Sequence, residues 1–185
     1  MRCSKLAVAI AVFMFLGAPA WAGESKDFAP KNGMFTVTMP AGEHAAPKRI
    51  LTIGGNKIAV EAFESKVDNG TLFVGASIGI PAKVMRDIPA DERLDTIGDA
   101  IAKSLDGKAG DKKDITQDGV PGREFQIETK DGAIRVQLYA IRGWVMYAFV
   151  QGKTKDDVSN KDSDAFFDSF KLSDKAKELF GRTRQ

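Results

Sequence analysis

The sequence predicts an α+β domain in which an antiparallel β-sheet, built from hairpins and a meander, is flanked by helices. Three observations lead to this prediction. Turn sequences recur along the chain, at residues 54–56, 68–70, 131–132 and 142–143. The segments between these turns alternate apolar and polar residues, as half-buried strands do. Other segments carry apolar residues at the spacing of an amphipathic helix.

The turns and the alternation together define seven strands. They are expected at residues 35–39, 49–53, 57–65, 71–80, 122–129, 133–141 and 144–151. The segment 106–114 is rich in Gly, Lys and Asp, so we expect a mobile loop there. The single histidine, His44, lies in a polar stretch close to Pro, which also predicts a loop.

The segment 122–151 is patterned well enough to predict its strand register. If Asp131 and Gly132 form a two-residue loop, Glu128 pairs with Arg135 across the first hairpin. The other pairs in this register are Ile127 with Val136, Gln126 with Gln137, and Phe125 with Leu138. A second two-residue loop at 142–143 gives the pairs Ile141 with Trp144, Ala140 with Val145, and Leu138 with Tyr147.

One face of this three-stranded meander is apolar and is expected to form a core face. It collects Phe125, Ile127, Ile134, Val136, Leu138, Ala140, Val145, Tyr147 and Phe149. The last strand is also apolar on its other side, through Trp144, Met146, Ala148 and Val150. We therefore expect this strand to be buried on both sides, with helices covering the second apolar stripe.

The two earlier hairpins are less consistent with each other. Loops at 55–56 and 69–70 give the pairs Ile53 with Ile58 and Phe63 with Ala76. The second pairing turns the apolar sides of its two strands away from each other, unless a β-bulge lies between residues 62 and 66. Asn69-Gly70-Thr71 also matches a glycosylation sequon, although a tight turn requires the same residues.

Three helices are expected to cover the sheet. Residues 89–105 carry Leu94, Ile97, Ile101 and Leu105 on one side, and residues 160–170 carry Phe166, Phe167 and Phe170 on one side. A short helix over 174–180 should end at Gly181.

The first 22 residues have the pattern of a secretory signal peptide. A basic start precedes an apolar run at 6–16, and Ala20-Trp21-Ala22 forms a small-x-small cleavage site. A membrane anchor is disfavoured, because about 18 apolar residues are needed to span a bilayer. We therefore expect a periplasmic or secreted protein with no membrane span after cleavage. Cleavage also removes Cys3, the single cysteine, and with it any disulfide.

The expected organisation is a signal peptide at 1–22, an N-terminal leader segment at 23–34, a single α+β domain at 35–172, and a short C-terminal helix and tail at 173–185. Loss of Arg2 and Lys5 with the leader reduces the 27 basic residues to 25, which equals the 25 acidic residues. A neutral chain gives no reason to expect nucleic acid or an anionic membrane surface as a partner.

Residues suited to catalysis are few, and we expect no enzyme activity, no cofactor and no metal site. Glu124 and Glu128 form a carboxylate pair in principle, but they lie on the polar side of the sheet, where a solvated surface is the default. Acidic residues at 106, 111 and 114 resemble scattered calcium ligands, yet the neighbouring lysines would repel the ion.

The best candidate for binding is a strip on the meander that contains Arg135 and Tyr139 and, near the second turn, Arg142 and Trp144. Planar aromatic rings beside guanidinium groups hold anionic or aromatic partners by stacking and by forked hydrogen bonds. The alternative is that Tyr139 and Trp144 pack under a helix. Arg123, after a Val-Pro-Gly turn, is a second and weaker candidate.

Four segments give the chain a resemblance to the PsbP-like fold family. They are residues 35–40 (FTVTMP), 118–125 (DGVPGREF), 139–147 (YAIRGWVMY) and 166–172 (FFDSFKL). The family includes the extrinsic photosystem II subunit, a nuclear Ran-binding protein and many bacterial exported proteins. The resemblance implies an α/β/α sandwich and an accessory or assembly role through surface contacts. It implies no catalytic motif and no cofactor.

These observations favour an exported, non-enzymatic α+β domain that binds an unknown envelope protein as an accessory or assembly factor. Two alternatives stay open. One is a carrier that holds a small molecule or lipid in a cavity between the sheet and the helices. The other is a carboxylate-based hydrolase, which requires two acidic side chains that converge in a cleft.

Overall fold

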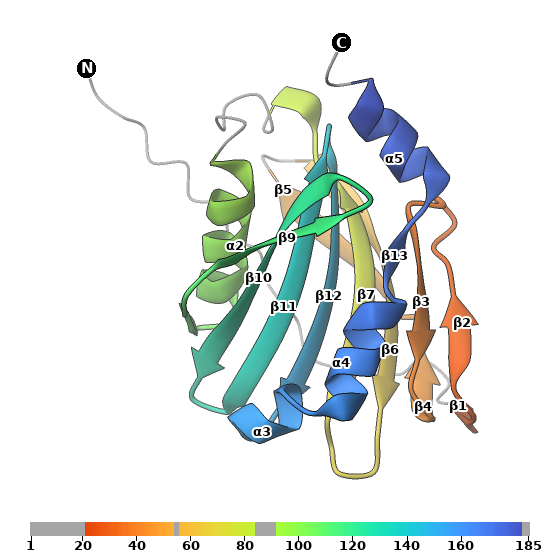
Figure 1. Cartoon of the computed structure of the whole chain (residues 1–185), viewed down its shortest axis with the longest axis vertical. Helices are drawn as coiled ribbons and strands as arrows, with labels where there is room; N and C mark the ends of the chain where they lie inside the picture. The colour runs from red at the N-terminus through yellow and green to blue at the C-terminus, as the bar shows by residue number, and fades with distance from the viewer. Residues whose placement is uncertain (1–20, 54–55, 84–91, 183–185) are drawn as a thin grey trace.

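The structure is a computed structural model that describes residues 21–53, 56–83 and 92–182 (Figure 1). Residues 1–20 of the expected signal peptide lie outside the described residues, as do the tip of the first predicted hairpin and the start of the first predicted helix. In the described part of the chain, none of the helices is long and apolar enough to cross a membrane.

Ten strands form one sheet with the order β1-β4-β6-β7-β12-β11-β10-β8, in which β5 pairs with β6 and β9 pairs with β10. A second, three-stranded sheet has the order β13-β3-β2. The strands are β1 (Trp21–Gly23), β2 (Lys26–Phe28), β3 (Phe35–Met39), β4 (Gly42–Ala45), β5 (Lys48–Ile53), β6 (Asn56–Lys66), β7 (Leu72–Gly79), β8 (Lys108–Ala109), β9 (Lys113–Gln117), β10 (Val120–Thr129), β11 (Gly132–Ile141), β12 (Trp144–Gly152) and β13 (Lys171–Leu172). The helices are α2 (Arg93–Ser104), α3 (Lys155–Val158), α4 (Lys161–Ser169) and α5 (Asp174–Gly181).

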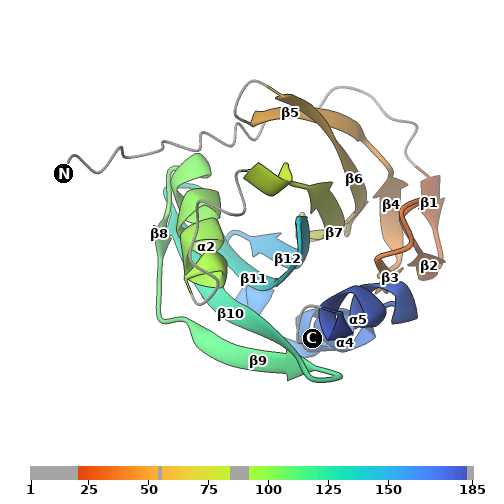
Figure 2. The same ribbon diagram turned by 90° about the horizontal axis from the view of Figure 1, so that it is seen from above.

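Helices cover both faces of the large sheet (Figure 2). α2 packs against β10 and β11 on one face. α4 and α5 lie on the opposite face, together with the three-stranded sheet. Neighbouring strands of the large sheet pair antiparallel, for example β11 with β12 and β12 with β7. The predicted α+β class, an antiparallel sheet flanked by helices, is confirmed.

The β10-β11-β12 meander keeps its predicted faces but not all of its predicted pairs. Between β11 and β12 the expected register is observed along the whole length. Between β10 and β11 the predicted pairing of Glu128 with Arg135 is wrong, since Arg135 lies opposite Gln126. The cause is the turn, which is Lys130-Asp131 and shifts every pair of this hairpin by two residues. Strand side chains alternate with a period of two, so a shift of two leaves each on its predicted face.

Strand β12 is buried on both sides, as the sequence predicts. Val145 on one side is 1% exposed, and Met146 on the other is 0% exposed. The Val145 side belongs to the predicted core face and packs under α2, in a cluster that contains Ile97 of that helix. The Met146 side belongs to a second cluster, with Phe166 of α4 and Phe35 of β3. The expected second covering layer is therefore confirmed.

Hairpin β5-β6 also shifts by two residues. Ile53 lies opposite Asn56, and the prediction that it lies opposite Ile58 is wrong. A shift of two residues does not exchange the two faces of a strand.

Hairpin β6-β7 resolves the mismatch seen in the sequence. The predicted partner of Phe63 is wrong by one residue, because Phe63 lies opposite Gly75. This odd shift places Val60 opposite Ile78, so the apolar sides of both strands share one face without a bulge. The cause is the loop, which extends over residues 67–71 instead of two residues.

Two segments expected to be loops contain strands. His44 lies in β4 opposite Ser65 of β6, and it is 6% exposed. The Lys- and Asp-rich segment 106–114 contributes β8 and the start of β9, both of which pair with β10. Both loop predictions are wrong because these short polar strands obtain their backbone partners from β6 and β10, which local sequence patterns do not report.

Segments on both sides of the predicted 35–172 domain pack with it. β2 pairs with β3, and Met34 is fully buried. At the other end, Ala176 of α5 belongs to the same core cluster. β1 pairs with β4 and spans the expected cleavage point, so cleavage after Ala22 would leave Gly23 as the sole residue of this strand.

Side-chain caps define where the later helices begin. Thr154 and Asp157 form a capping box at α3. Asn160 caps α4, and Ser173 caps α5. Such caps satisfy backbone N–H groups that have no partner within the helix. They fix the positions of α3 and α4 beside the meander, where the predicted binding strip lies.

Candidate binding surface

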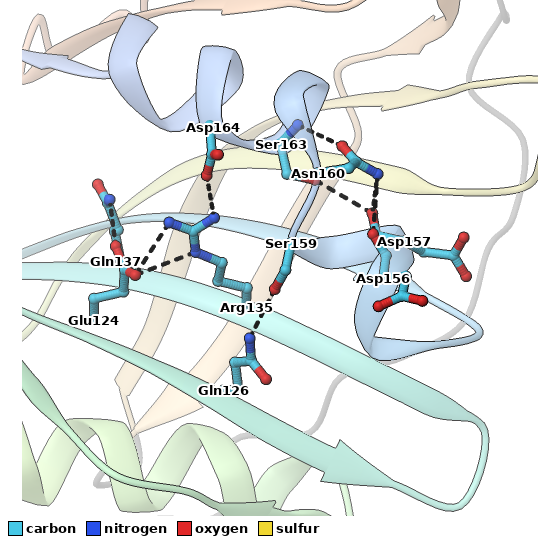
Figure 3. Close-up of polar contacts among 10 residues, drawn as sticks. All are labelled: Glu124, Gln126, Arg135, Gln137, Asp156, Asp157, Ser159, Asn160, Ser163 and Asp164. Atoms are coloured by element: carbon cyan, nitrogen blue, oxygen red, sulfur yellow. Dashed lines mark hydrogen bonds and ion pairs between the residues drawn. The ribbon is translucent and has the colours of Figure 1, made fainter.

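Arg135 lies under α4, and other side chains engage its guanidinium group (Figure 3). Nη1 is 2.6 Å from Asp164 Oδ1 of α4, and Nη2 is 3.1 Å from Glu124 Oε1 of β10. Gln137 Nε2 donates to the other Glu124 oxygen at 2.8 Å. The guanidinium carbon is 4.7 Å from the centre of the Phe167 ring. Arg135 therefore links α4 to the sheet and directs its donors to the protein itself.

A second polar contact joins the same sheet to the connection between α3 and α4. Gln126 Nε2 donates to Ser159 Oγ at 2.9 Å (Figure 3). Asn160 Nδ2 donates to the carbonyl oxygen of Asp157 at 3.0 Å. Polar side chains of β10 and β11 thus hold the helices in place.

Arg123 is engaged on the other face of the sheet, beside α2. Its Nε donates to Asp95 Oδ1 of α2 at 3.0 Å, and its Nη1 binds Asp114 of β9. Lys112 adds a bond of 2.6 Å to Asp99 of the same helix. Arg123 therefore connects α2 with β9 and β10. It shares no contact with the Arg135 cluster.

Tyr139 is part of the core, with 2% of its surface exposed. Its ring stacks on Phe170 with the two centres 6.1 Å apart, and it lies against Gly122 of the neighbouring strand. Burial, together with the charge of Glu124, raises the pKa of Tyr139 to about 12. The alternative reading of Tyr139, as a side chain packed beneath a covering layer, is therefore the one observed.

We expect the free energy of unfolding to fall as pH rises from 10 to about 12. The unfolded chain releases the Tyr139 proton near pH 10, whereas the folded protein holds it to about pH 12. The contribution of protonated Tyr139 to the free energy of unfolding is therefore fully present below pH 10. It is lost as pH rises through the folded pKa. Tyr139→Phe should flatten this part of the profile in urea unfolding. Tyr147→Phe, which changes the other tyrosine of the chain, is the control and should retain the fall. An equal slope in wild type and Tyr139→Phe would contradict the assignment.

Arg142 and Trp144 lie at the tight turn between β11 and β12. Arg142 is exposed and has a φ of 51°, a left-handed conformation that side chains with a Cβ rarely adopt. Trp144 is half-buried, with its ring over Gly79 of β7. Arg142 Nη2 donates to the carbonyl oxygen of Arg182, the last described residue of the chain, at 2.5 Å.

α5 contacts two turns that each contain a residue with a positive φ. Lys177 Nζ is 2.8 Å from Asp118, which also has a positive φ of 51°. The hydrogen bond and the charge of Lys177 lower the pKa of Asp118. The second turn is the one that carries Arg142. We call Arg142, Trp144 and Arg182 the turn surface, because they meet where the β11-β12 turn contacts the end of α5.

The four residues of the predicted strip therefore do not form one continuous binding surface, and the separate candidate Arg123 lies on the other face of the sheet. Arg135 and Arg123 make ion pairs on opposite faces of the sheet, and Tyr139 is buried. Arg142 and Trp144 remain together at the turn surface. The partners of Arg135 on α4 were not identified from the sequence, because their contact depends on where that helix lies on the sheet.

The two carboxylates considered for hydrolysis do not converge. Glu124 is bound by Arg135 and Gln137. Glu128 is exposed and lies 2.5 Å from Lys155 Nζ. The hydrogen bond and charge of Lys155 lower the pKa of Glu128, which is the opposite of what a general acid requires.

Two of the remaining candidates for catalysis or metal binding, His44 and Asp114, have structural partners. His44 Nε2 is 2.7 Å from the carbonyl oxygen of Pro40, and its ring is edge-on to Phe28 with the centres 5.6 Å apart. Asp114 binds Arg123. Within residues 21–53, 56–83 and 92–182, no group of three His, Cys, Asp or Glu side chains is placed to hold a metal ion.

The architecture defines an α+β domain whose antiparallel sheet is covered on both faces. No protein-family model matches the sequence, and no curated protein matches it. Among solved structures, the chain is similar to the solution structure of cyanobacterial PsbP (CyanoP) from Synechocystis sp. PCC 6803. The TM-score is 0.49 with 13% sequence identity, over 88% of this chain and 98% of that chain. That protein is a PsbP, the family that four segments of the sequence resemble, and the similarity carries no statement about the activity or partner of this chain.

Proposed function

We propose that the chain is an exported, non-catalytic domain that binds an envelope protein through the turn surface and acts as an accessory or assembly factor. The observation that carries the proposal is the position of Arg142. Among the five nominated residues, it alone is exposed. The leader pattern at 1–22 supports export.

The backbone at this turn is the one that a two-residue hairpin loop requires. The favoured loops of this length have a positive φ at the first position, which costs a residue with a Cβ about 1 kcal/mol or more. Arg142 is followed by Gly143, which has a φ of 155°. This turn places a long cationic side chain at the tip of the hairpin, two residues before the half-buried Trp144.

The chemistry of the turn surface fits a partner that presents an anionic or aromatic group. Guanidinium groups bind carboxylates through two parallel hydrogen bonds, and an adjacent indole adds a flat apolar contact. Arg and Trp are the side chains that most often dominate binding energy at protein interfaces. Arg182, at the end of α5, contributes its backbone oxygen to this surface, while its own guanidinium pairs with Glu178.

The test is recovery of partners from an envelope extract with purified protein as bait. We expect the double variant Arg142→Gln and Trp144→Leu to lose at least about ten-fold in partner recovery, as hot-spot residues do. Lys130→Gln is the matched control, because Lys130 is an exposed cation in the β10-β11 turn, at the opposite end of β11. Urea unfolding of each variant shows whether the fold is retained. Unchanged recovery with the folded double variant would count against the turn surface.

One feature favours the carrier alternative, on the face of the sheet that α2 covers in part. Tyr147 and Phe149 stack with their centres 6.2 Å apart and are half-buried beside the apolar cluster of β6 and β7. On the α4 face, by contrast, Phe35 and Phe170 are fully buried and stack at 4.7 Å. Native mass spectrometry separates the two proposals, since a co-purified small ligand supports the carrier and a ligand-free mass favours the protein-binding function.

A further inference from the structure

The loop between β6 and β7 contains an Asn-Gly pair in a defined turn. The N–H of Thr71 donates to Asn69 Oδ1 at 2.8 Å, and the N–H of Gly70 donates to the carbonyl oxygen of Val67 at 2.8 Å. Gly70 has a φ of 86°. Asn69 and Gly70 are exposed, and the loop extends beyond the end of the sheet (Figure 1).

The chain contains a second Asn-Gly pair with the same internal hydrogen bonds. The N–H of Met34 donates to Asn32 Oδ1 at 3.1 Å, and the N–H of Gly33 donates to the carbonyl oxygen of Pro30 at 2.8 Å. Gly33 has a φ of 65°. The two pairs therefore share the Asn-Gly step, the same two hydrogen bonds and a positive φ at the glycine.

Their surroundings differ. Asn32 is held by three further hydrogen bonds to other elements: Nδ2 donates to Ser77 Oγ at 2.6 Å, the backbone N–H donates to Glu61 Oε2 at 3.1 Å, and the backbone oxygen accepts from Lys175 Nζ at 2.8 Å. Among the described residues, the side-chain nitrogen of Asn69 has no hydrogen-bond partner. Asn69 is therefore free to change its backbone and side-chain torsions by opening its own turn alone.

We propose that Asn69 is a site of spontaneous deamidation in the folded protein and that Asn32 is protected. The backbone nitrogen of Gly70, after losing its proton to hydroxide, attacks Cγ of Asn69. Nδ2 takes a proton from water, the Cγ–Nδ2 bond breaks, ammonia leaves and a five-membered succinimide forms, so that hydroxide is regenerated. Water then opens the ring, at Cγ to give aspartate or at the backbone carbonyl to give isoaspartate.

Two features of the turn favour this reaction at Asn69. The N–H of Thr71 withdraws electrons from the Asn69 carbonyl, and it stabilises the negative charge that develops on Oδ1 during attack. Gly70 has no Cβ, and a Cβ built on it would meet nothing within 4 Å, so its nitrogen approaches Cγ without steric hindrance. The bond from Gly70 to the backbone oxygen of Val67 must open first, and it lies within a loop whose residues 68–70 are exposed.

The product changes this end of the molecule. Deamidation adds a carboxylate next to Asp68, and the isoaspartate form also lengthens the backbone by one carbon inside the loop. Both remove the Asn-Gly-Thr sequon. The hydrogen bond from Thr71 that shapes the turn is retained in the aspartate form, because a carboxylate oxygen still accepts it.

The test is incubation of the purified protein at mildly alkaline pH, followed by peptide mass spectrometry of both Asn-Gly segments. In the folded protein we expect Asn69 to convert at least about ten-fold faster than Asn32, because three hydrogen bonds to other elements must open before Asn32 can close a ring. In concentrated urea the two sites should convert at equal rates. Isoaspartate at residue 69 is detected by its specific enzymatic methylation.

Two variants serve as controls for this test. Asn69→Gln keeps an amide but cannot form a five-membered ring with Gly70, so it should abolish conversion in that peptide. Ser77→Ala removes the acceptor of the Asn32 side chain and should bring the Asn32 rate closer to that of Asn69. Equal rates at Asn32 and Asn69 in the folded wild type would overturn the proposal. So would conversion of both sites in urea with no conversion of Asn69 in the folded protein.

Discussion

Phe170→Ala is expected to lower the free energy of unfolding by about 3–5 kcal/mol, the usual cost of removing a buried aromatic ring. Phe170 is 0% exposed and lies at the end of α4. It stacks on Phe35 of β3 at 4.7 Å and on Tyr139 of β11 at 6.1 Å. The ring therefore joins the helix, the small sheet and the large sheet, and its loss leaves a cavity shared by all three.

The measurement for Phe170→Ala is urea unfolding followed by circular dichroism. Domains of this size are stable by about 5–15 kcal/mol, so the variant should remain folded but unfold at markedly lower urea. Phe170→Leu is the control, since it keeps most of the volume and should lose less. A loss below about 1 kcal/mol for Phe170→Ala would show that the three elements do not meet at this ring.

The faces of the sheet were predictable from the sequence even where the pairs were not. Turn residues at 131–132 and 55–56 suggested loops that are shifted by one residue from the observed ones. Moving a two-residue loop by one position changes the register by two. Because side chains alternate along a strand, such errors leave the apolar residues on the correct side. The burial of β12 on both sides was therefore predictable without the correct partner for Arg135.

The register of β6 and β7 shows that an odd error in loop length does place side chains on the wrong face. Here the loop spans residues 67–71, so its length differs from the predicted one by an odd number and the predicted faces conflict. The conflict was itself a signal. It indicated that a two-residue loop was wrong, although it did not distinguish a longer loop from a bulge.

Short polar strands were not predictable, because their stability comes from partners far away in the sequence. β4 contains Glu43 and His44 and pairs with the end of β6, about twenty residues later. β9 is largely exposed and is a strand because β10 supplies its backbone hydrogen bonds. Neither segment has the alternating apolar pattern that sequence reasoning uses.

The candidate site was predictable only in part, because the sequence indicates the faces of the strands but not the position of α4. The sequence places Arg135 and Glu124 on one face of neighbouring strands, which permits an ion pair. It does not show that α4 lies over them and adds Asp164 and Phe167. A side chain that looked available for a partner is thereby committed to the fold. At the turn surface, Arg142 is exposed although it also bonds to the end of α5, and the sequence-based choice stays a binding proposal.

Gly122→Ala is the second substitution expected to have a large effect, because the ring of Tyr139 occupies the space of the missing side chain. A Cβ on Gly122 would lie 2.6 Å from Tyr139 Cε1 and 2.8 Å from the backbone oxygen of Leu138. The ring cannot simply rotate away, since its other face stacks on Phe170. The backbone oxygen belongs to β11, so the strands themselves must separate. We expect a loss of about 1–3 kcal/mol in the free energy of unfolding, as for other overpacked cores.

Gly110→Ala is the matched control for Gly122→Ala. Its Cβ would meet a single atom, the backbone oxygen of Gln126, at an ordinary contact distance of 3.5 Å. Without a clash, alanine restricts the unfolded chain and should be neutral or raise the free energy of unfolding by up to about 1 kcal/mol. The difference between the two variants in urea unfolding isolates the steric effect of Tyr139. Equal stability of the two variants would mean that the Tyr139 ring can move away from Gly122. That result would also remove the basis for the raised pKa of Tyr139, because the clash and the pKa both depend on the same buried position of the ring.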